Sequence, residues 1–191
     1  MPYHFFALIS RMRYIGRWGL MRNTFRENIQ EHSHMVAVLA HALAVIRRDV
    51  FGGEIDPGQA AVLALYHDAP EILTGDLPTP VKYYNPEIRD AYREVEDVSA
   101  RKLLSMLPEE LRPAYTPVLI QEEDGYHALV KAADKLSAHI KCLEELKAGN
   151  LEFRQAAQQT RQALEESPLP EVAYFLEHLL PGFHLTLDEL Q

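Results

Sequence analysis

The sequence predicts an all-α protein, and three observations support that prediction. Apolar residues recur at spacings of three and four through most of the chain, which is the period of a helix. Runs of alternating β-branched residues and Asn-Gly hairpin turns are missing from the sequence, so strand signals are scarce. The chain has 191 residues, of which 47% are hydrophobic, enough for one sizeable core. We therefore expect a single helical domain over residues 1–191.

Two helices are predicted before residue 50. The first covers about 4–14 and ends before Gly16, because glycine is common just past a helix end. The second covers about 28–48 and has one apolar stripe that includes His32. The stripe consists of Ile29, His32, Val36, Leu39, Leu43 and Ile46.

The third predicted helix carries an adjacent histidine and aspartate. It begins at Asp56-Pro57, where aspartate caps the helix and proline takes its first position. His67 and Asp68 fall near its end on the apolar side. The loop over 74–80 follows, where one glycine and two prolines exclude a regular helix.

Four more helices are predicted in the second half, at about 86–107, 126–147, 151–166 and 171–180. Most charges of the first of these are expected to form a solvated face. Pro108 and the region of Pro113 mark the break after it. Asp134 borders the apolar face of the helix at 126–147, where a carboxylate needs a partner because burying an unpaired charge is costly.

Composition narrows the class of protein. The net charge of −9 argues against a nucleic-acid polymer as partner. No apolar run approaches the roughly 18 residues of a membrane helix. A single cysteine excludes an internal disulfide and suits a reducing cytoplasm. Five arginines and no acid precede Glu27, which fits either a small phosphorylated ligand or a solvated face that balances the acidic remainder.

Four polar residues stand on or beside core-facing positions: His32, His67, Asp68 and Asp134. Each alone has a simpler explanation, since a lone buried histidine is more often a satisfied core residue. Together, two imidazoles and two carboxylates can complete a divalent metal site, and this nitrogen and oxygen set suits Mn, Co, Fe, Ni or Zn. Glu71, four residues after His67, adds a candidate acid or base.

The order His32, His67-Asp68, Asp134 resembles the signature of the HD-domain phosphohydrolases. Arg17-Trp18 and the loop from Thr74 to Pro80 resemble the bacterial 5′-deoxynucleotidase subgroup of that family, and the resemblance covers nearly the whole chain. One departure is Pro70, where a smaller residue is usual.

The resemblance implies one HD-domain helical bundle with the metal site in its helix core. It implies a hydrolase that cleaves deoxyribonucleoside 5′-monophosphates to deoxynucleoside and phosphate, with broad base tolerance and selection against ribonucleotides. It implies one divalent transition metal, cobalt, manganese or similar, and a cytoplasmic homodimer. The metal ligands implied are His32, His67, Asp68 and Asp134.

The resemblance also implies roles for the remaining site residues. Arg17 would bind the phosphate and Trp18 would orient it through its indole N–H or ring face. Glu71 would position or deprotonate the attacking water, or protonate the leaving oxygen, with Asp68 and Trp18 completing the catalytic set. Asp76 would read the sugar. The full set of implied substrate contacts is Arg17, Trp18, His32, Asp68, Asp76, Leu77, Pro78, Thr79 and Asp134.

Three alternatives stay open at this point. The chain could be another HD-domain phosphohydrolase that acts on nucleoside triphosphates, cyclic nucleotides or alarmones. It could be a helical binding module with a structural metal, which would need neither Glu71 nor Arg17. It could also be a helical interaction protein whose core histidines are satisfied without a metal.

Overall fold

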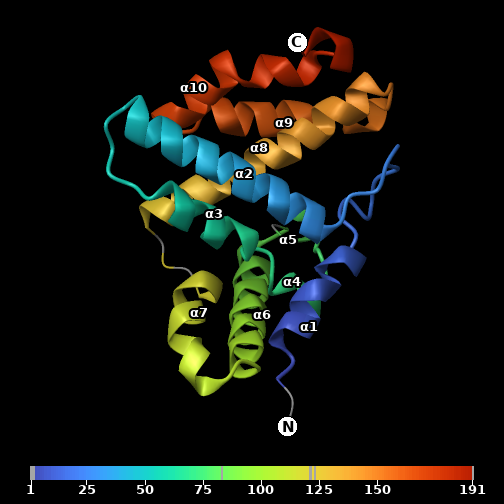
Figure 1. The fold of residues 1–191 in the computed structure, drawn as a ribbon. Helices are drawn as coiled ribbons and strands as arrows, with labels where there is room; N and C mark the ends of the chain where they lie inside the picture. Colours follow the sequence, from blue (N-terminus) through green and yellow to red (C-terminus); the bar gives the residue numbers. More distant parts are fainter. Residues whose placement is uncertain (1–2, 83, 121, 123, 191) are drawn as a thin grey trace. The chain divides into compact units, whose positions relative to one another are not determined.

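The computed structural model describes residues 3–82, 84–120, 122 and 124–190, and within them the regular elements are helical (Figure 1). One isolated antiparallel bridge joins Gly16 and Asn28. The chain divides into two compact units, formed by residues 1–34 with 65–122 and by residues 35–64 with 123–191. Among the described residues, no helix has the length and apolarity that crossing a membrane requires.

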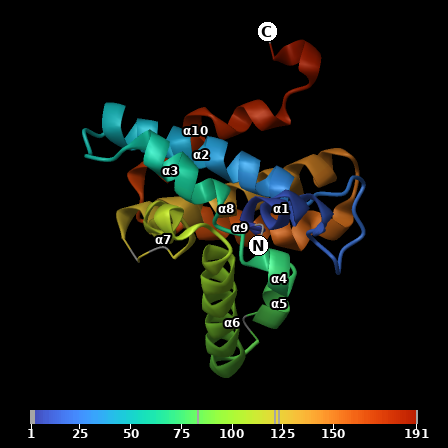
Figure 2. The ribbon, with the colours of Figure 1, turned by 60° about the horizontal axis from the view of Figure 1, so that its bottom comes forward.

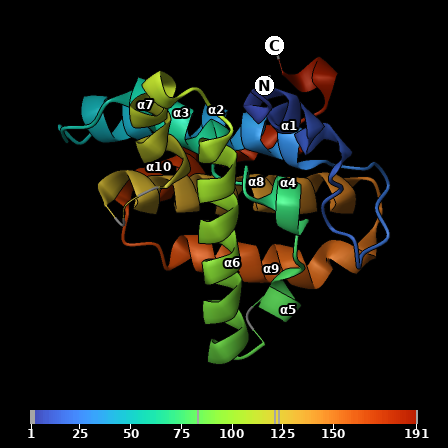
Figure 3. The same cartoon turned by 90° about the horizontal axis from the view of Figure 1, so that it is seen from below.

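The first unit has a small core of aromatic and aliphatic side chains. Its helices are α1 (Phe5–Ile9), α4 (Glu71–Thr74), α5 (Thr79–Lys82), α6 (Pro86–Ser105) and α7 (Arg112–Leu119), with the first turn of α2 (Ile29–Asp49). The long helix α6 packs against α4, α5 and α7, as Figures 2 and 3 show. Phe5 is buried among Leu103, Leu107 and Leu119, and its ring meets that of Tyr115 edge to face.

The second unit contains most of α2 together with α3 (Pro57–Leu65), α8 (Gly125–Lys147), α9 (Arg154–Glu165) and α10 (Pro170–His178). Short 3₁₀ turns over Leu151–Phe153, Leu180–His184 and Leu187–Glu189 connect and follow these helices. Helix α9 packs against both α8 and α10. The apolar stripe predicted for α2 is buried as expected, and its members from Val36 onward lie in the core of this unit.

Short polar side chains start the long helices where the sequence predicts. Asn28 accepts hydrogen bonds from the N–H groups of Gln30 and Glu31, both at 3.0 Å, and so caps α2. Asn85 caps α6 and Asp124 caps α8 in the same way. Each such cap stabilises its helix by about 1 kcal/mol, because it satisfies N–H groups that have no partner inside the helix.

The predicted helix through His67 and Asp68 is wrong in its second part, because α3 ends at Leu65 and residues 66–70 form turns. Pro70 is compatible with this turn, because it has no N–H to donate to the carbonyl of Tyr66. That carbonyl accepts from Ala69 instead, at 3.0 Å, so the chain tightens. A new helix, α4, begins at Glu71.

Two short helices were not predicted. The loop over 74–80 runs into α5, in which Pro80 occupies the first turn, where a missing N–H costs little. Helix α7 starts with Pro113 in its first turn and contains Pro117, which removes only one helical hydrogen bond. The first predicted helix is also divided, into α1 and a 3₁₀ turn over Ser10–Tyr14.

A buried ion pair lies on α8 in the second unit. The ammonium group of Lys141 donates to the carboxylate of Glu145, and both side chains are almost wholly buried. Asn150 donates to the second oxygen of Glu145 at 2.8 Å, which links the end of α8 to the following 3₁₀ turn. Each charge is therefore compensated inside the core.

We expect Glu145→Ala to lower the free energy of unfolding by about 3 kcal/mol, because it leaves the Lys141 charge buried. Glu165→Ala is the matched control, since it breaks the exposed Arg161–Glu165 pair of the same spacing and should cost less than about 0.5 kcal/mol. Urea unfolding of both variants measures the difference. Equal losses would contradict the structural importance of the buried pair.

Candidate active site

Three of the four predicted metal ligands come together in the first unit. His32, His67 and Asp68 each offer a ligand atom, and these atoms all lie within 4.8 Å of one another. The Nε2 atom of His67 lies 3.2 Å from Asp68 Oδ1, and that of His32 lies 3.6 Å from Asp68 Oδ2. His32 is fully buried, whereas the other two are partly accessible. One carboxylate thus faces two imidazoles.

Local sequence explains why these groups meet. His32 lies in the first turn of α2, on the stripe whose apolar members are buried, so its ring is held inside the protein. His67 and Asp68 lie in the tight turn over residues 66–70, between α3 and α4. Adjacent residues in a turn can both face one point, whereas on a regular helix they would diverge by about 100°.

The donor set fits a divalent transition metal. Two imidazole nitrogens and a carboxylate oxygen are ligands that Zn, Mn, Co or Fe accept, and the spacing of the three ligand atoms allows one ion to reach them all. Asp134, the expected fourth ligand, lies half-buried on α8 in the second unit. That Asp134 is a metal ligand stays a prediction.

Glu71 is a buried carboxyl group beside this cluster. Glu71 is 7% exposed, and its Oε2 atom has no hydrogen-bond partner. Burial, together with the nearby charges of Asp68 and Asp76, raises the pKa of Glu71 to about 9, against the smaller opposing effects of Arg17 and Lys82. In the absence of a metal ion the Glu71 carboxyl is therefore neutral at pH 7.

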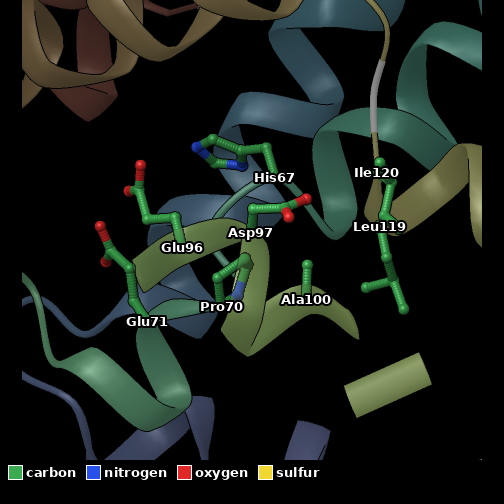
Figure 4. Close-up of a pocket in the computed structure, with 8 residues that line it drawn as sticks. All are labelled: His67, Pro70, Glu71, Glu96, Asp97, Ala100, Leu119 and Ile120. Atoms are coloured by element: carbon green, nitrogen blue, oxygen red, sulfur yellow. The ribbon is translucent and has the colours of Figure 1, made fainter. Parts of the chain in front are cut away.

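Glu71 lines a cavity of about 210 Å³ next to the cluster (Figure 4). The other lining residues are His67, Pro70, Glu96, Asp97, Ala100, Leu119 and Ile120. Figure 4 shows the carboxyl groups of Glu71, from α4, and Glu96, from α6, extending to the same side of the cavity. Glu96 was expected on a solvated helix face, so the sequence did not predict that it lines this cavity.

Arg17 and Trp18 lie beside the candidate metal ligands, and Arg17 contacts one of them. Arg17 donates from Nη1 to Asp68 Oδ2 at 3.3 Å and from Nε to Glu27 Oε2 at 3.2 Å. Trp18 donates its indole N–H to the same Glu27 oxygen at 2.9 Å. The indole N–H that was expected to reach a phosphate is thus directed at Glu27. Glu27, the first acid after five arginines, was not among the predicted site residues.

The loop predicted to contact the sugar lies against α6. Asp76 is half-buried, and burial raises its pKa while the charge of Arg17 opposes the rise; it also accepts a backbone hydrogen bond from Trp18. Tyr92 of α6 donates to the carbonyl of Gly75 at 3.3 Å. Leu77 and Pro78 are half-buried, and the side chain of Thr79 lies outside the described residues.

Lys82 fixes the other end of this loop. Its ammonium group donates to Glu96 at 2.8 Å and lies 4.7 Å from the centre of the Tyr92 ring. Burial lowers the pKa of Lys82, but the hydrogen bond and charge of Glu96 outweigh this effect and raise it overall. Residues on α6 thereby hold both ends of the segment that contains Asp76.

Comparison with known proteins gives matches over almost the whole chain. The model of the YfbR-like 5′-deoxynucleotidase family matches residues 4–183. A Vibrio cholerae protein named 5′-deoxynucleotidase is 52% identical over 189 residues, which are 98% of this chain and 97% of that protein. The Escherichia coli protein named 5′-deoxynucleotidase YfbR is 50% identical over 189 residues, 98% of this chain and 95% of that protein.

Solved structures support the same assignment. An HD-domain phosphohydrolase from Listeria innocua has a TM-score of 0.84 at 26% identity, and the match covers 96% of this chain and 90% of that one. The cyanophage S-2L HD phosphohydrolase DatZ, solved with dA and one catalytic Zn²⁺, has a TM-score of 0.63 at 22% identity, covering 92% and 96%. The second likeness shows the fold alone.

These matches confirm the predicted all-α HD-domain fold and the predicted class of enzyme, a phosphoric monoester hydrolase. They also confirm the resemblance based on the His32, His67-Asp68 and Arg17-Trp18 motifs. The chain belongs to the YfbR-like 5′-deoxynucleotidase family.

Proposed function

We propose that the protein is a metal-dependent 5′-deoxynucleotidase that hydrolyses deoxyribonucleoside 5′-monophosphates. The names of the relatives that are about half identical support this reaction. One structural observation carries the proposal: the Asp68 carboxylate faces both histidines of the cluster and also accepts a hydrogen bond from Arg17. A phosphate-binding cation therefore lies beside the group that would hold a metal ion.

His32, His67 and Asp68 would hold the ion, with Asp134 as the fourth ligand. Cobalt and manganese are our first candidates, since both accept this mixture of nitrogen and oxygen donors. When bound, such an ion makes water a nucleophile at neutral pH and offsets the negative charge of the phosphate. The cytoplasmic homodimer and the single domain over residues 1–191 stay predictions from the sequence.

Arg17 would bind the phosphate oxygens through its planar guanidinium group. Its contacts with Asp68 and Glu27 hold that group in one orientation. Trp18 would present its ring face, because its indole N–H is bonded to Glu27. Both residues then orient the phosphate for in-line displacement, where positioning supplies much of the rate.

Glu71 would deliver a proton to the leaving 5′-oxygen. In the metal-free protein, burial raises the pKa of Glu71 and favours the protonated carboxyl group, and a neutral acid is what this step needs. An anionic phosphate next to Glu71 would favour the protonated form further, because like charges repel. A purely structural metal site would have no use for a buried, unpartnered carboxyl group of this kind.

Asp76 would accept a hydrogen bond from the sugar 3′-hydroxyl, and the loop around it would leave no room for a 2′-hydroxyl. The anchoring of this loop by Tyr92 and Lys82 supports a rigid fit. Exclusion of one hydroxyl by fit gives about a hundredfold preference. Leu77 and Pro78 offer apolar and backbone contact that does not distinguish bases, so we infer broad base tolerance.

The proposed reaction is tested by phosphate release from dAMP, dGMP, dCMP, dTMP, dUMP and AMP. The protein is first stripped of metal, and Mn, Co, Zn or Mg is then added back. We expect release from every deoxynucleotide, about a hundredfold less from AMP, and none without metal. No release from any nucleotide while metal remains bound would favour the structural-metal alternative.

Asp76→Ala is the variant that tests sugar selection. It removes the side chain that would leave no room for a 2′-hydroxyl, so the gap in rate between dAMP and AMP should narrow. Asp97→Ala serves as control, because Asp97 lines the cavity without belonging to the loop over 74–80. An unchanged ratio of the two rates in Asp76→Ala would contradict the role of Asp76.

Asp134→Ala tests the fourth ligand independently of activity. We expect metal content after dialysis to fall in Asp134→Ala as it does in His32→Ala, since each removes one donor. Asp124→Ala, a helix cap in the same unit, is the control and should keep its metal. Metal content is read by elemental analysis, and full retention in Asp134→Ala would exclude Asp134 as a ligand.

Glu71→Gln should lower kcat about 10²–10⁴-fold, because a proton donor is lost. It should also make the metal-free protein more stable at pH 8, by about 1–3 kcal/mol. The folded state keeps this proton up to a pKa of about 9, whereas the unfolded chain loses it near 4.5, so wild-type stability falls as pH rises between these values.

Urea unfolding in chelator at pH 5 and pH 8 measures this effect. The wild type should lose more stability than Glu71→Gln over that interval. Equal losses in the two proteins would show that Glu71 is ionised in the folded state at pH 8, which would remove the basis for assigning it the proton donation.

A further inference from the structure

We propose that Glu27 is a positioning residue that fixes Arg17 and Trp18 in the orientation a substrate phosphate requires. The inference rests on the proposed deoxynucleotidase reaction and extends it to a residue to which the resemblance assigned no role. Glu27, Arg17 and Trp18 all belong to the first unit, as do His32, His67 and Asp68.

A single oxygen of Glu27 receives both donors. Its Oε2 atom accepts from Arg17 Nε at 3.2 Å and from Trp18 Nε1 at 2.9 Å. The side chains of Glu27 and Arg17 are each only 13% exposed, so solvent screens their attraction weakly. Hydrogen bonds to an ionised carboxylate are stronger and more directional than those between neutral groups. The guanidinium and indole planes are therefore held relative to one another.

The backbone of the same segment reinforces this arrangement. The Arg17 N–H donates to the Glu27 carbonyl at 2.9 Å, and the Ile29 N–H donates to the Ile15 carbonyl at 3.0 Å, on either side of the bridge between Gly16 and Asn28. Glu27 thus contacts Arg17 through both its main chain and its side chain. These backbone hydrogen bonds join the segment over residues 15–17 to the segment over residues 27–29, next to Trp18.

Trp18 has a backbone φ of 59°, in the left-handed region that bulky residues avoid. Such a conformation costs on the order of 1–3 kcal/mol and persists only where surrounding contacts impose it. The indole bond to Glu27 and the backbone bond to Asp76 are contacts of that kind. Strain of this kind is concentrated at functional sites, which supports a role in orienting the substrate and not only in folding.

The contacts form one continuous path from Glu27 to the candidate metal ligands. Glu27 holds Arg17, Arg17 donates to Asp68, and Asp68 faces His32 and His67. Loss of Glu27 would leave the metal ligands in place but release the groups that align the phosphate. The expected effect therefore falls on kcat more than on KM, because alignment matters most in the transition state.

The test compares Glu27→Ala, Glu27→Gln and Glu27→Asp in the full-length enzyme reconstituted with manganese. Glu27→Ala should lower kcat for dAMP about a hundredfold, with a smaller change in KM. Glu27→Gln keeps an oxygen acceptor at the same reach and should recover activity to within about tenfold of the wild type. Glu27→Asp keeps the charge but withdraws it by one methylene group, so it should resemble the alanine variant.

Trp18 provides a readout that does not depend on activity, because it is the only tryptophan of the chain. The fluorescence anisotropy of Trp18 should fall in Glu27→Ala and return in Glu27→Gln. Glu110→Ala is the matched control: Glu110 is an exposed acid of the same unit, and its removal changes the net charge equally. Its anisotropy and kcat should equal those of the wild type.

A merely structural role would lower the thermal midpoint of all three Glu27 variants while leaving kcat per folded molecule and Trp18 anisotropy unchanged. That outcome, or a glutamine variant as slow as the alanine variant, would overturn the proposal. A wild-type enzyme that releases no phosphate from any nucleotide would instead contradict the proposed function. The anisotropy comparison would still decide whether Glu27 holds Trp18.

Discussion

The two oxygens of the Asp68 carboxylate face different partners, and the candidate site is arranged around them. Oδ1 lies near His67, whereas Oδ2 lies near His32 and accepts a hydrogen bond from Arg17. A carboxylate can serve several donors or ligands at once because each oxygen carries two lone pairs. One side chain therefore connects the residues proposed to hold a metal ion with the arginine proposed to bind phosphate.

A tight turn over residues 66–70 separates α3 from α4. Pro70 fits this turn because it has no N–H to donate to the carbonyl of Tyr66. That turn presents His67 and Asp68 together and starts α4 with Glu71 buried. Burial raises the pKa of the Glu71 carboxyl, which costs stability as pH rises and favours the neutral acid that the proposed reaction needs. Stability and activity thus make opposite demands on one residue.

The remaining site groups are held by residues that do not react. Glu27 holds Arg17 and Trp18, while Tyr92 and Lys82 fix the loop that contains Asp76. These supporting contacts convert flexible side chains and a proline-containing loop into fixed elements. Preorganisation of this kind reduces the entropy that substrate binding must remove.

The sequence by itself determined the helical class, the starts of the long helices and three residues of the candidate metal site. Caps such as Asn28 and Asp124 and the stripe that contains His32 are local patterns, and local hydrogen bonds and helical periodicity enforce them wherever they occur. The motifs around Arg17-Trp18 and His67-Asp68 identified the family for the same reason, since they are short and contiguous.

The tertiary structure decided what depends on contacts between distant residues. Arg17 donates a hydrogen bond to Asp68, which lies 51 positions later in the sequence. The charged helix α6 places Glu96 in the cavity wall and Tyr92 against the carbonyl of Gly75. Helix α7 contains two prolines and packs against α6. The partnership of Glu27 with Trp18 and the burial of Glu71 have no signature in spacing. Periodicity reports which face of an element is apolar, whereas the pairing of polar groups follows from how the elements pack, which no local pattern encodes.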